Sequence, residues 1–230
     1  MVWSDQMWVS INEVQSTCLK AARNAGYPWG LAEEAAAAAR WLAMRGLPFL
    51  EPLGSGVLTQ MHRLESLSSA RRIGSSFGPS NPSRRLGPIS VLTALADEHL
   101  APNLAVAEVS FRSLAAPIFI VPILAKLSRR HEQPLLVRWP GVALECRSGE
   151  IAMDGRCQSG LDCAFADWVS VAKSPNLAVE ARPNGILLRQ GAELDSDRWR
   201  DLKALSDRDY VPEGETVRLQ SSEAGLIDND

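Results

Sequence analysis

The sequence predicts an α+β fold, in which a helical N-terminal part packs on a mostly antiparallel sheet. Apolar residues recur at helical spacing over the first sixty residues, whereas short stretches with a period of two follow one another after residue 134. Helices grouped first and strands grouped later are typical of α+β rather than alternating α/β proteins. We therefore divide the chain into a helical part (1–65), a flexible loop rich in Ser, Arg, Gly and Pro (66–88) and an α+β part (89–230).

Start and stop signals delimit the first two helices. Ser10 and Glu13 form a capping box ahead of a helix that ends at Gly26. A second helix is expected over 29–45, because a proline precedes its first turn and Gly46 follows its last. Its run of five alanines lets a neighbouring helix approach closely, so we interpret this stretch as core packing rather than the wall of a binding site.

The remaining elements are less regular. A third helix over 48–64 is interrupted by two glycines, and another helix is expected over 89–100. The apolar stretch 114–127 is interpreted as a buried helix that is kinked at Pro122 and ends in the basic turn at residues 129 and 130. The last helix is expected over 199–206. An antiparallel meander is predicted from short strands over 135–139, 142–146, 150–153, 164–171, 177–181 and 186–189.

Composition and motifs exclude several classes of function. The net charge of -3 gives no general attraction to phosphate, so nucleic acid is not expected as a partner; the basic loop from Arg71 to Arg85 lacks the aromatic residues of a single-strand site. No apolar run reaches the roughly 20 residues of a membrane span, and the N-terminus does not resemble a secretion signal, so we expect a cytoplasmic protein. The spacing of the cysteines and histidines matches no metal cluster, and no nucleotide-binding glycine motif occurs, so no metal and no cofactor are expected.

Two sequence resemblances add to this reading. The helix start WGLAEEA, the stretch YVPEGETVRL and the closing AGLIDND resemble the proteobacterial family known as domain of unknown function 3726, over most of residues 9–230. That resemblance implies no activity. The two helices followed by Arg45 and Gly46 are similar, more weakly, to the opening of the malate and L-lactate dehydrogenases that lack a Rossmann fold. In that family an AspSerHisGly motif follows, whereas LPFLEPLGSG follows here, so the similarity implies a shared helical hairpin without that chemistry.

Two functions are compatible with the sequence. The lack of a recognisable nucleophile, metal cluster or nucleotide cradle favours an accessory or binding protein that acts with a partner enzyme or as a homo-oligomer. The alternative is a small-molecule enzyme with a carboxylate and arginine site between the helical part and the sheet. In that hypothesis Glu33 or Glu34 is the general base, Arg138 holds an anion, and Trp29 or Trp139 forms an apolar wall.

The acidic C-terminus supports one further hypothesis. Asp228, Asn229 and Asp230 are interpreted as a tail that contacts the folded domain or a partner subunit. We expect the two carboxylates to meet basic residues such as Arg40 or Arg45 on the second helix.

Overall fold

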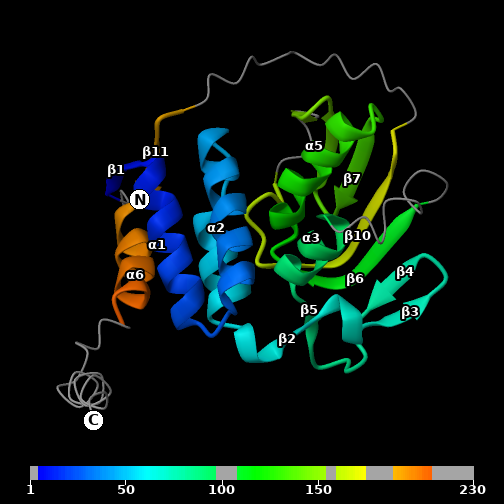
Figure 1. Ribbon diagram of the computed structural model, residues 1–230, viewed down its shortest axis with the longest axis horizontal. Helices are drawn as coiled ribbons and strands as arrows, with labels where there is room; N and C mark the ends of the chain where they lie inside the picture. The colour runs from blue at the N-terminus through cyan, green and yellow to red at the C-terminus, as the bar shows by residue number, and fades with distance from the viewer. Residues whose placement is uncertain (1–4, 97–107, 154–158, 175–188, 209–230) are drawn as a thin grey trace, which may run out of the picture.

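The computed structural model describes residues 5–96, 108–153, 159–174 and 189–208, and it confirms the α+β class. Helices of the N-terminal half pack against a mixed sheet of several strands (Figure 1). From one side to the other, the helices α1 and α6 come first, then α2, and then α3 and α5 with the sheet. Within the described ranges, no helix is both long and apolar enough to cross a membrane.

The first two predicted helices are confirmed as α1 (Ile11–Asn24) and α2 (Trp29–Met44). Glu13 N donates a hydrogen bond to the Ser10 side chain over 3.2 Å, as a capping residue requires. The alanines of α2 are largely buried where the helix packs on α1, which confirms core packing, while Ala37, Ala38 and Ala43 also line cavities described below. Its buried alanines are Ala32, Ala35, Ala36, Ala38, Ala39 and Ala43.

The end of the described chain returns to the first helices. The strand β1 (Gln6–Ser10) pairs antiparallel with β11 (Gly191–Asp195), and α6 (Ser196–Ser206) packs against α1. Asn24 at the end of α1 donates hydrogen bonds to the carbonyls of the last turn of α6. Neither β1 nor β11 was predicted, because each is short and becomes a strand only beside the other.

The predicted third helix is split in two, near its glycines. A π-helical turn, η1 (Pro52–Leu58), is followed by the 3-10 turn η2 (Met61–Arg63). A Cβ atom at Gly56 would lie 2.6 Å from the Ala164 carbonyl oxygen, so this glycine permits close contact between η1 and the chain entering the sheet.

The segment 66–88, which we predicted to be a flexible loop, contains short strands that the sequence did not reveal. Besides the 3-10 turn η3 (Leu67–Ser69), the segment forms β3 (Arg71–Ile73), β4 (Ser76–Gly78) and β5 (Arg85–Leu86). The strand β2 (Leu64–Glu65) pairs with β5, and β4 pairs with the central strand β6. The nearly buried Glu65 carboxylate accepts hydrogen bonds from Ser80 N (2.9 Å), Ser80 Oγ (2.7 Å) and Asn81 N (3.4 Å), which holds the connection between β4 and β5 in place.

The prediction of one kinked helix over 114–127 is wrong. The strand β6 (Val109–Ala115) occupies the start of this stretch, and Ala116 leaves it with a φ of 40°. A 3-10 turn, η4 (Pro117–Ile120), then leads into α5 (Val121–Arg130), which ends at the predicted basic turn. Pro122 lies in the first turn of α5, where its missing N–H interrupts no helical hydrogen bond. The helix expected over 89–100 is present as α3 (Pro88–Ala96), and residues 97–107 lie outside the described ranges.

The meander is confirmed in part. The strands β7 (Leu135–Trp139), β8 (Val142–Arg147) and β9 (Glu150–Met153) are antiparallel neighbours. The strand β10 (Phe165–Lys173) instead lies between β6 and β7, so the order along the sheet is β2-β5-β6-β10-β7-β8-β9, with β3 and β4 beside β6. The predicted strand 177–181 and most of 186–189 lie outside the described residues.

Candidate functional site

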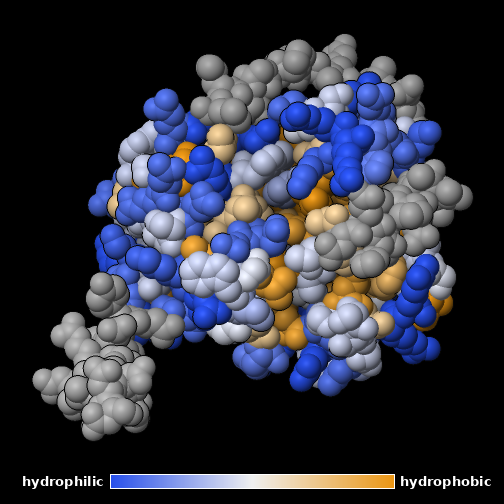
Figure 2. Space-filling view, viewed as in Figure 1, coloured by the Kyte–Doolittle hydropathy of each residue, from blue (hydrophilic) through white to orange (hydrophobic). Residues whose placement is uncertain are grey.

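A cavity of about 690 Å³ lies between α2, α3, α5 and the turn that joins β8 to β9. We call it the basic pocket. On the face in view in Figure 2, hydrophobic residues gather between α2 and the α3–α5 pair, with hydrophilic residues around them. Its volume is within the range of small-molecule sites. The pocket is lined by Glu34, Ala37, Ala38, Trp41, Arg45, Leu92, Ala96, Pro122, Ile123, Lys126, Arg129, Arg130, Ser148, Gly149 and Glu150.

The charges of the basic pocket are unbalanced. Four of its lining residues are basic and two are acidic, Glu34 and Glu150. Three of the basic residues come from α5, and two of them, Arg129 and Arg130, lie in its last turn, where the helix dipole favours positive charge. Lys126 and Arg129 form no ion pair with the residues that the structure describes. The pocket therefore offers positive charge that the described fold does not neutralise.

Arg45 is the most buried of these cations. Its side chain is only 9% exposed, and its guanidinium carbon lies 3.9 Å from the centre of the Trp41 ring. Arg45 Nη2 lies 3.4 Å from Glu150 Oε1, while Arg45 Nε is buried and has no hydrogen-bond partner among the described residues. Buried polar groups are nearly always hydrogen-bonded. The guanidinium is therefore held over an aromatic ring, and its Nε can still donate a hydrogen bond.

The wall opposite α2 is fixed by a tight turn. Ser148 and Gly149 both have positive φ, 52° and 89°. Gly149 N donates to Ser128 Oγ over 3.4 Å, and Ser128 Oγ donates to the Ala125 carbonyl over 2.8 Å. A Cβ at Gly149 would lie 3.2 Å from Arg129 Cδ, so the glycine lets the arginine stem pack over the turn. Contacts with α5 thus hold the turn that forms this wall of the basic pocket.

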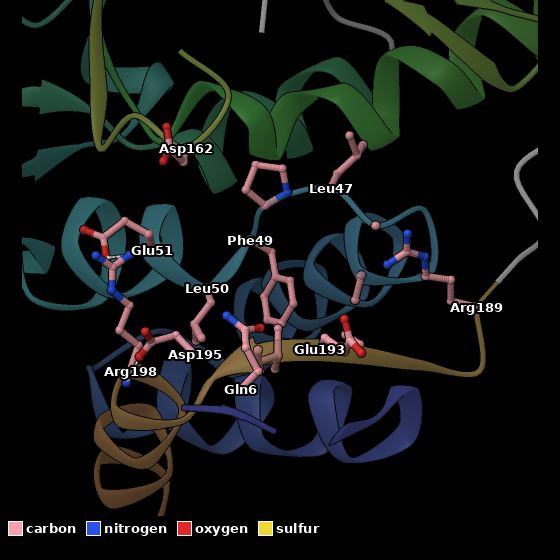
Figure 3. Close-up of a pocket in the computed structure, with 15 residues that line it drawn as sticks. Gln6, Leu47, Phe49, Leu50, Glu51, Asp162, Arg189, Glu193, Asp195 and Arg198 are labelled. Atoms are coloured by element: carbon pink, nitrogen blue, oxygen red, sulfur yellow. Dashed lines mark hydrogen bonds and ion pairs between the residues drawn. The ribbon is translucent and has the colours of Figure 1, made fainter. Parts of the chain in front are cut away.

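A second cavity, of about 330 Å³, lies beside the C-terminal end of α2, between β11, the start of η1 and the chain before β10 (Figure 3). We call it the acidic pocket, because four acidic and two basic residues line it. Arg198 Nη1 pairs with Glu51 Oε2 at 2.6 Å, and Arg198 N donates to the Asp195 side chain over 3.0 Å to cap α6. Its titratable lining residues are Glu51, Asp162, Arg189, Glu193, Asp195 and Arg198.

Three of the six charged residues that line the acidic pocket already interact with one another. Figure 3 shows Glu51, Asp195 and Arg198 together on one side of Phe49, with Arg189 and Glu193 on the other. The first group joins η1 to the start of α6. Because the partners are already present, we regard the basic pocket as the stronger candidate for ligand binding.

The five predicted site residues do not form one site. Trp29 is 59% exposed and Glu33 is also exposed, whereas Glu34 lines the basic pocket. Arg138 is exposed on β7. Trp139 is buried and donates from Nε1 to the Gly160 carbonyl over 2.9 Å, so it supports the fold rather than lining the basic pocket.

The tail residues Asp228, Asn229 and Asp230 lie outside the described ranges. Of the two arginines proposed to meet them, Arg40 donates hydrogen bonds to side-chain oxygens on α1, and Arg45 pairs with Glu150. Both arginines therefore already have contacts within the domain.

The sequence contained a signal for the basic pocket that we did not use. Trp41 and Arg45 are four residues apart on one helix, a spacing that places two side chains on the same face. We interpreted Arg45 as a helix-end residue and as a partner of the acidic tail, not as part of a pocket. The contribution of Lys126 and Arg129 could not be found this way, because α5 meets α2 only in the tertiary structure.

The three cysteines in the described ranges are poor nucleophiles. Burial raises the pKa of the Cys146 thiol to about 12, with a further contribution from the charge of Glu145, and burial also raises the pKa of Cys18. The pKa of the half-buried Cys163 is raised too, first by burial. A thiol reacts as its thiolate, so these three remain unreactive at neutral pH. No cluster of three His, Cys, Asp or Glu side chains suited to a metal ion occurs in the ranges described.

Comparison with known proteins gives one match. Residues 9–81 match the family described as "Protein of unknown function (DUF3726)", which confirms that resemblance for the stretch containing α1, α2 and Arg45. No curated protein and no solved structure matches the chain. The family's description gives no activity, so function has to be argued from the pocket.

Proposed function

We propose that the protein is an accessory protein that binds a small organic anion in the basic pocket. The observation that carries the proposal is Arg45, which is nearly buried on Trp41 with an unpaired Nε while Lys126 and Arg129 line the same cavity. Three cations around one cavity suit a carboxylate or phosphate group. We expect the protein to act in the bacterial cytoplasm, with a partner enzyme or as a homo-oligomer.

The apolar residues that line the basic pocket indicate what the uncharged part of the ligand is like. Apolar side chains from α2, α3 and α5 line the same cavity as the cations. Trp41 offers an aromatic face, and a cavity of about 690 Å³ has room for a body beyond the charged group. The ligand class is therefore an anion with an aromatic or aliphatic body rather than a bare inorganic ion.

The contact between Arg45 and Glu150 is weak enough for a bound anion to replace it. Glu150 is 64% exposed and its oxygen lies 3.4 Å from the guanidinium, so the pair is a weak one. An incoming anion can replace Glu150 as the partner of Arg45, while Glu150 remains hydrated.

The first experiment uses phenyl phosphate as the probe in a thermal-shift titration of the full chain. A ligand that binds only the folded state raises the melting temperature with its concentration. Inorganic phosphate tests the charge without the body, and phenol tests the body without the charge. We expect phenyl phosphate to give a larger shift than either.

Matched variants locate the binding. Arg45→Gln and the double variant Lys126→Gln/Arg129→Gln are expected to weaken phenyl phosphate binding at least tenfold, in line with the loss of charged hydrogen bonds. Arg198→Gln removes an arginine from the acidic pocket and should leave the affinity unchanged. Equal shifts in all the variants, or no shift in the natural chain, would contradict the proposal.

A second candidate function is catalysis in the same pocket. The observation in its favour is that Glu34, a carboxylate, lines the cavity together with Arg45. An enzyme of this kind would convert a bound anion, and Glu34→Gln would stop conversion while the thermal shift persists. Mass spectrometry of each shifting compound after incubation distinguishes this enzyme from a binding protein.

A further inference from the structure

The helical elements α5 and η4 pack against the main sheet, and several side chains on the side of the sheet away from them are exposed. Residues paired across neighbouring strands project to the same side of a sheet, and residues two apart along a strand share that side. Phe77, Phe111, Val169 and Val137 are buried on the side where α5 and η4 pack. The residues between them in sequence project to the opposite side.

Two rows of side chains cross this opposite side. In the first row, Arg71 is paired with Gly78, and Arg112 with Trp168. Arg112 lies directly over Gly78, since a Cβ at that glycine would be 3.5 Å from Arg112 Cβ. The second row runs across five strands through Ile73, Ser76, Ser110, Ser170 and Arg138.

Two exposed apolar side chains stand in these rows. Trp168 is 45% exposed and Ile73 is 64% exposed. We call this surface the arginine face, and it consists of Arg71, Ile73, Arg112, Arg138 and Trp168.

The cations of the arginine face have no acidic partner in the described chain. Arg71, Arg112 and Arg138 take part in none of the described ion pairs. Nearby, Glu145 is paired with Arg147 at 2.6 Å, and Asp167 is exposed beside Trp168. Positive charge therefore exceeds negative charge on this face, around the exposed Trp168 side chain. Tryptophan and arginine are the residues enriched in protein interfaces.

The segment 209–230 has the complementary composition. It contains six acidic residues and one basic residue, Arg218, together with aliphatic and aromatic residues that suit an apolar contact. Its acidic residues are Asp209, Glu213, Glu215, Glu223, Asp228 and Asp230.

We infer that segment 209–230 docks on the arginine face of its own chain. Its carboxylates pair with Arg71, Arg112 and Arg138, and its apolar residues cover Trp168. This site differs from the one expected at Arg40 and Arg45: Arg40 is hydrogen-bonded to side chains of α1, and the Arg45 side chain is only 9% exposed.

The segment is long enough to reach this surface. An extended chain of 22 residues spans about 70 Å, whereas a domain of this size has a radius of gyration of roughly 17 Å. A tethered segment also has an effective concentration in the millimolar range, which favours its own chain over a second copy.

Zero-length carbodiimide cross-linking of the full chain tests this inference. The reagent joins a lysine amine to a carboxylate in contact with it, and the arginine face has no lysine. Arg112→Lys and Arg138→Lys introduce the amine while keeping the positive charge at exposed positions. The native lysines Lys20 on α1 and Lys126 in the basic pocket serve as internal comparators.

We expect cross-links from positions 112 and 138 to acidic residues of 209–230. Their yield should fall several-fold in 1 M salt, where charges are screened over about 3 Å, and again when Trp168→Ser is added. A mixture of isotope-labelled and unlabelled chains separates links within a chain from links between chains. Links that join two chains, links from the segment to Lys20 or Lys126 alone, or no link at all would each overturn the inference.

Discussion

Glu65 and Arg45 are two charged residues that the fold almost removes from water, in two different ways. Glu65 is 5% exposed and accepts three hydrogen bonds from the connection between β4 and β5. The Arg45 side chain is 9% exposed, yet it has one long ion pair and an unpaired Nε. The first arrangement is complete without a ligand and serves the fold. The second is incomplete in the described chain, and this difference is why we assign function to the basic pocket.

Mutation of Glu65 is expected to have the largest effect on stability. Glu65→Ala leaves three donors near the β4–β5 connection without their acceptor, so we expect the free energy of unfolding to fall by about 3 kcal/mol. Urea denaturation of the full chain measures this change in the free energy of unfolding. A loss below about 0.5 kcal/mol would remove the distinction between the two sites.

The pH dependence of stability is the next largest effect. Burial by itself would raise the pKa of Glu65, but the hydrogen bonds from Ser80 and Asn81, with the charge of Arg84, lower it below its ordinary value. A lowered pKa in the folded state stabilises the protein above the pKa of the unfolded chain, and this contribution is lost as the pH falls through the folded value. The stability difference between the natural chain and Glu65→Gln should therefore shrink from pH 7 towards pH 3.

Arg45→Ala is expected to have a smaller effect on stability than the change at Glu65. The variant loses the contact with Trp41 and a weak pair with Glu150, which amounts to about 1 kcal/mol. It should nevertheless abolish most of the thermal shift given by phenyl phosphate. A stability loss as large as that of Glu65→Ala, with ligand binding retained, would indicate a structural role instead.

Glu150→Gln sharpens the assignment further. The residue is exposed, so the free energy of unfolding should change by less than about 0.5 kcal/mol. Removing this competing carboxylate leaves Arg45 more available, and we expect phenyl phosphate to bind a few-fold more tightly. An unchanged or weaker affinity in an isothermal titration would argue against Arg45 as the anion-binding residue.

The smallest effect is expected in the acidic pocket. Arg198 and Glu51 are 55% and 35% exposed, so Arg198→Ala should cost no more than about 0.5 kcal/mol. Affinity for phenyl phosphate should not change. A marked loss of affinity would show that the two cavities are linked, and would weaken the distinction between a structural and a ligand-binding set of charges.

The sequence alone determined the α+β class, because helical and strand periods are local properties. The limits of α1 and α2 followed from Ser10, Pro28 and Gly46, whose effects depend on the neighbouring backbone. The strands β7, β8 and β9 followed from alternation in the same way. The turn signals around them were also local.

Tertiary structure decided the pairings and the site. Serines and arginines obscured the alternation of apolar and polar residues in β3 and β4, so these strands were not predicted. They form because Phe77 stacks on Phe111 and β4 pairs with β6. Likewise, β1 and β11 stand at opposite ends of the described chain and become strands only together. Nothing local to Arg45 shows that α5 will bring Lys126 and Arg129 into the same cavity. Local patterns could determine the elements, while contacts between distant residues determined which charges were satisfied and which were left for a ligand.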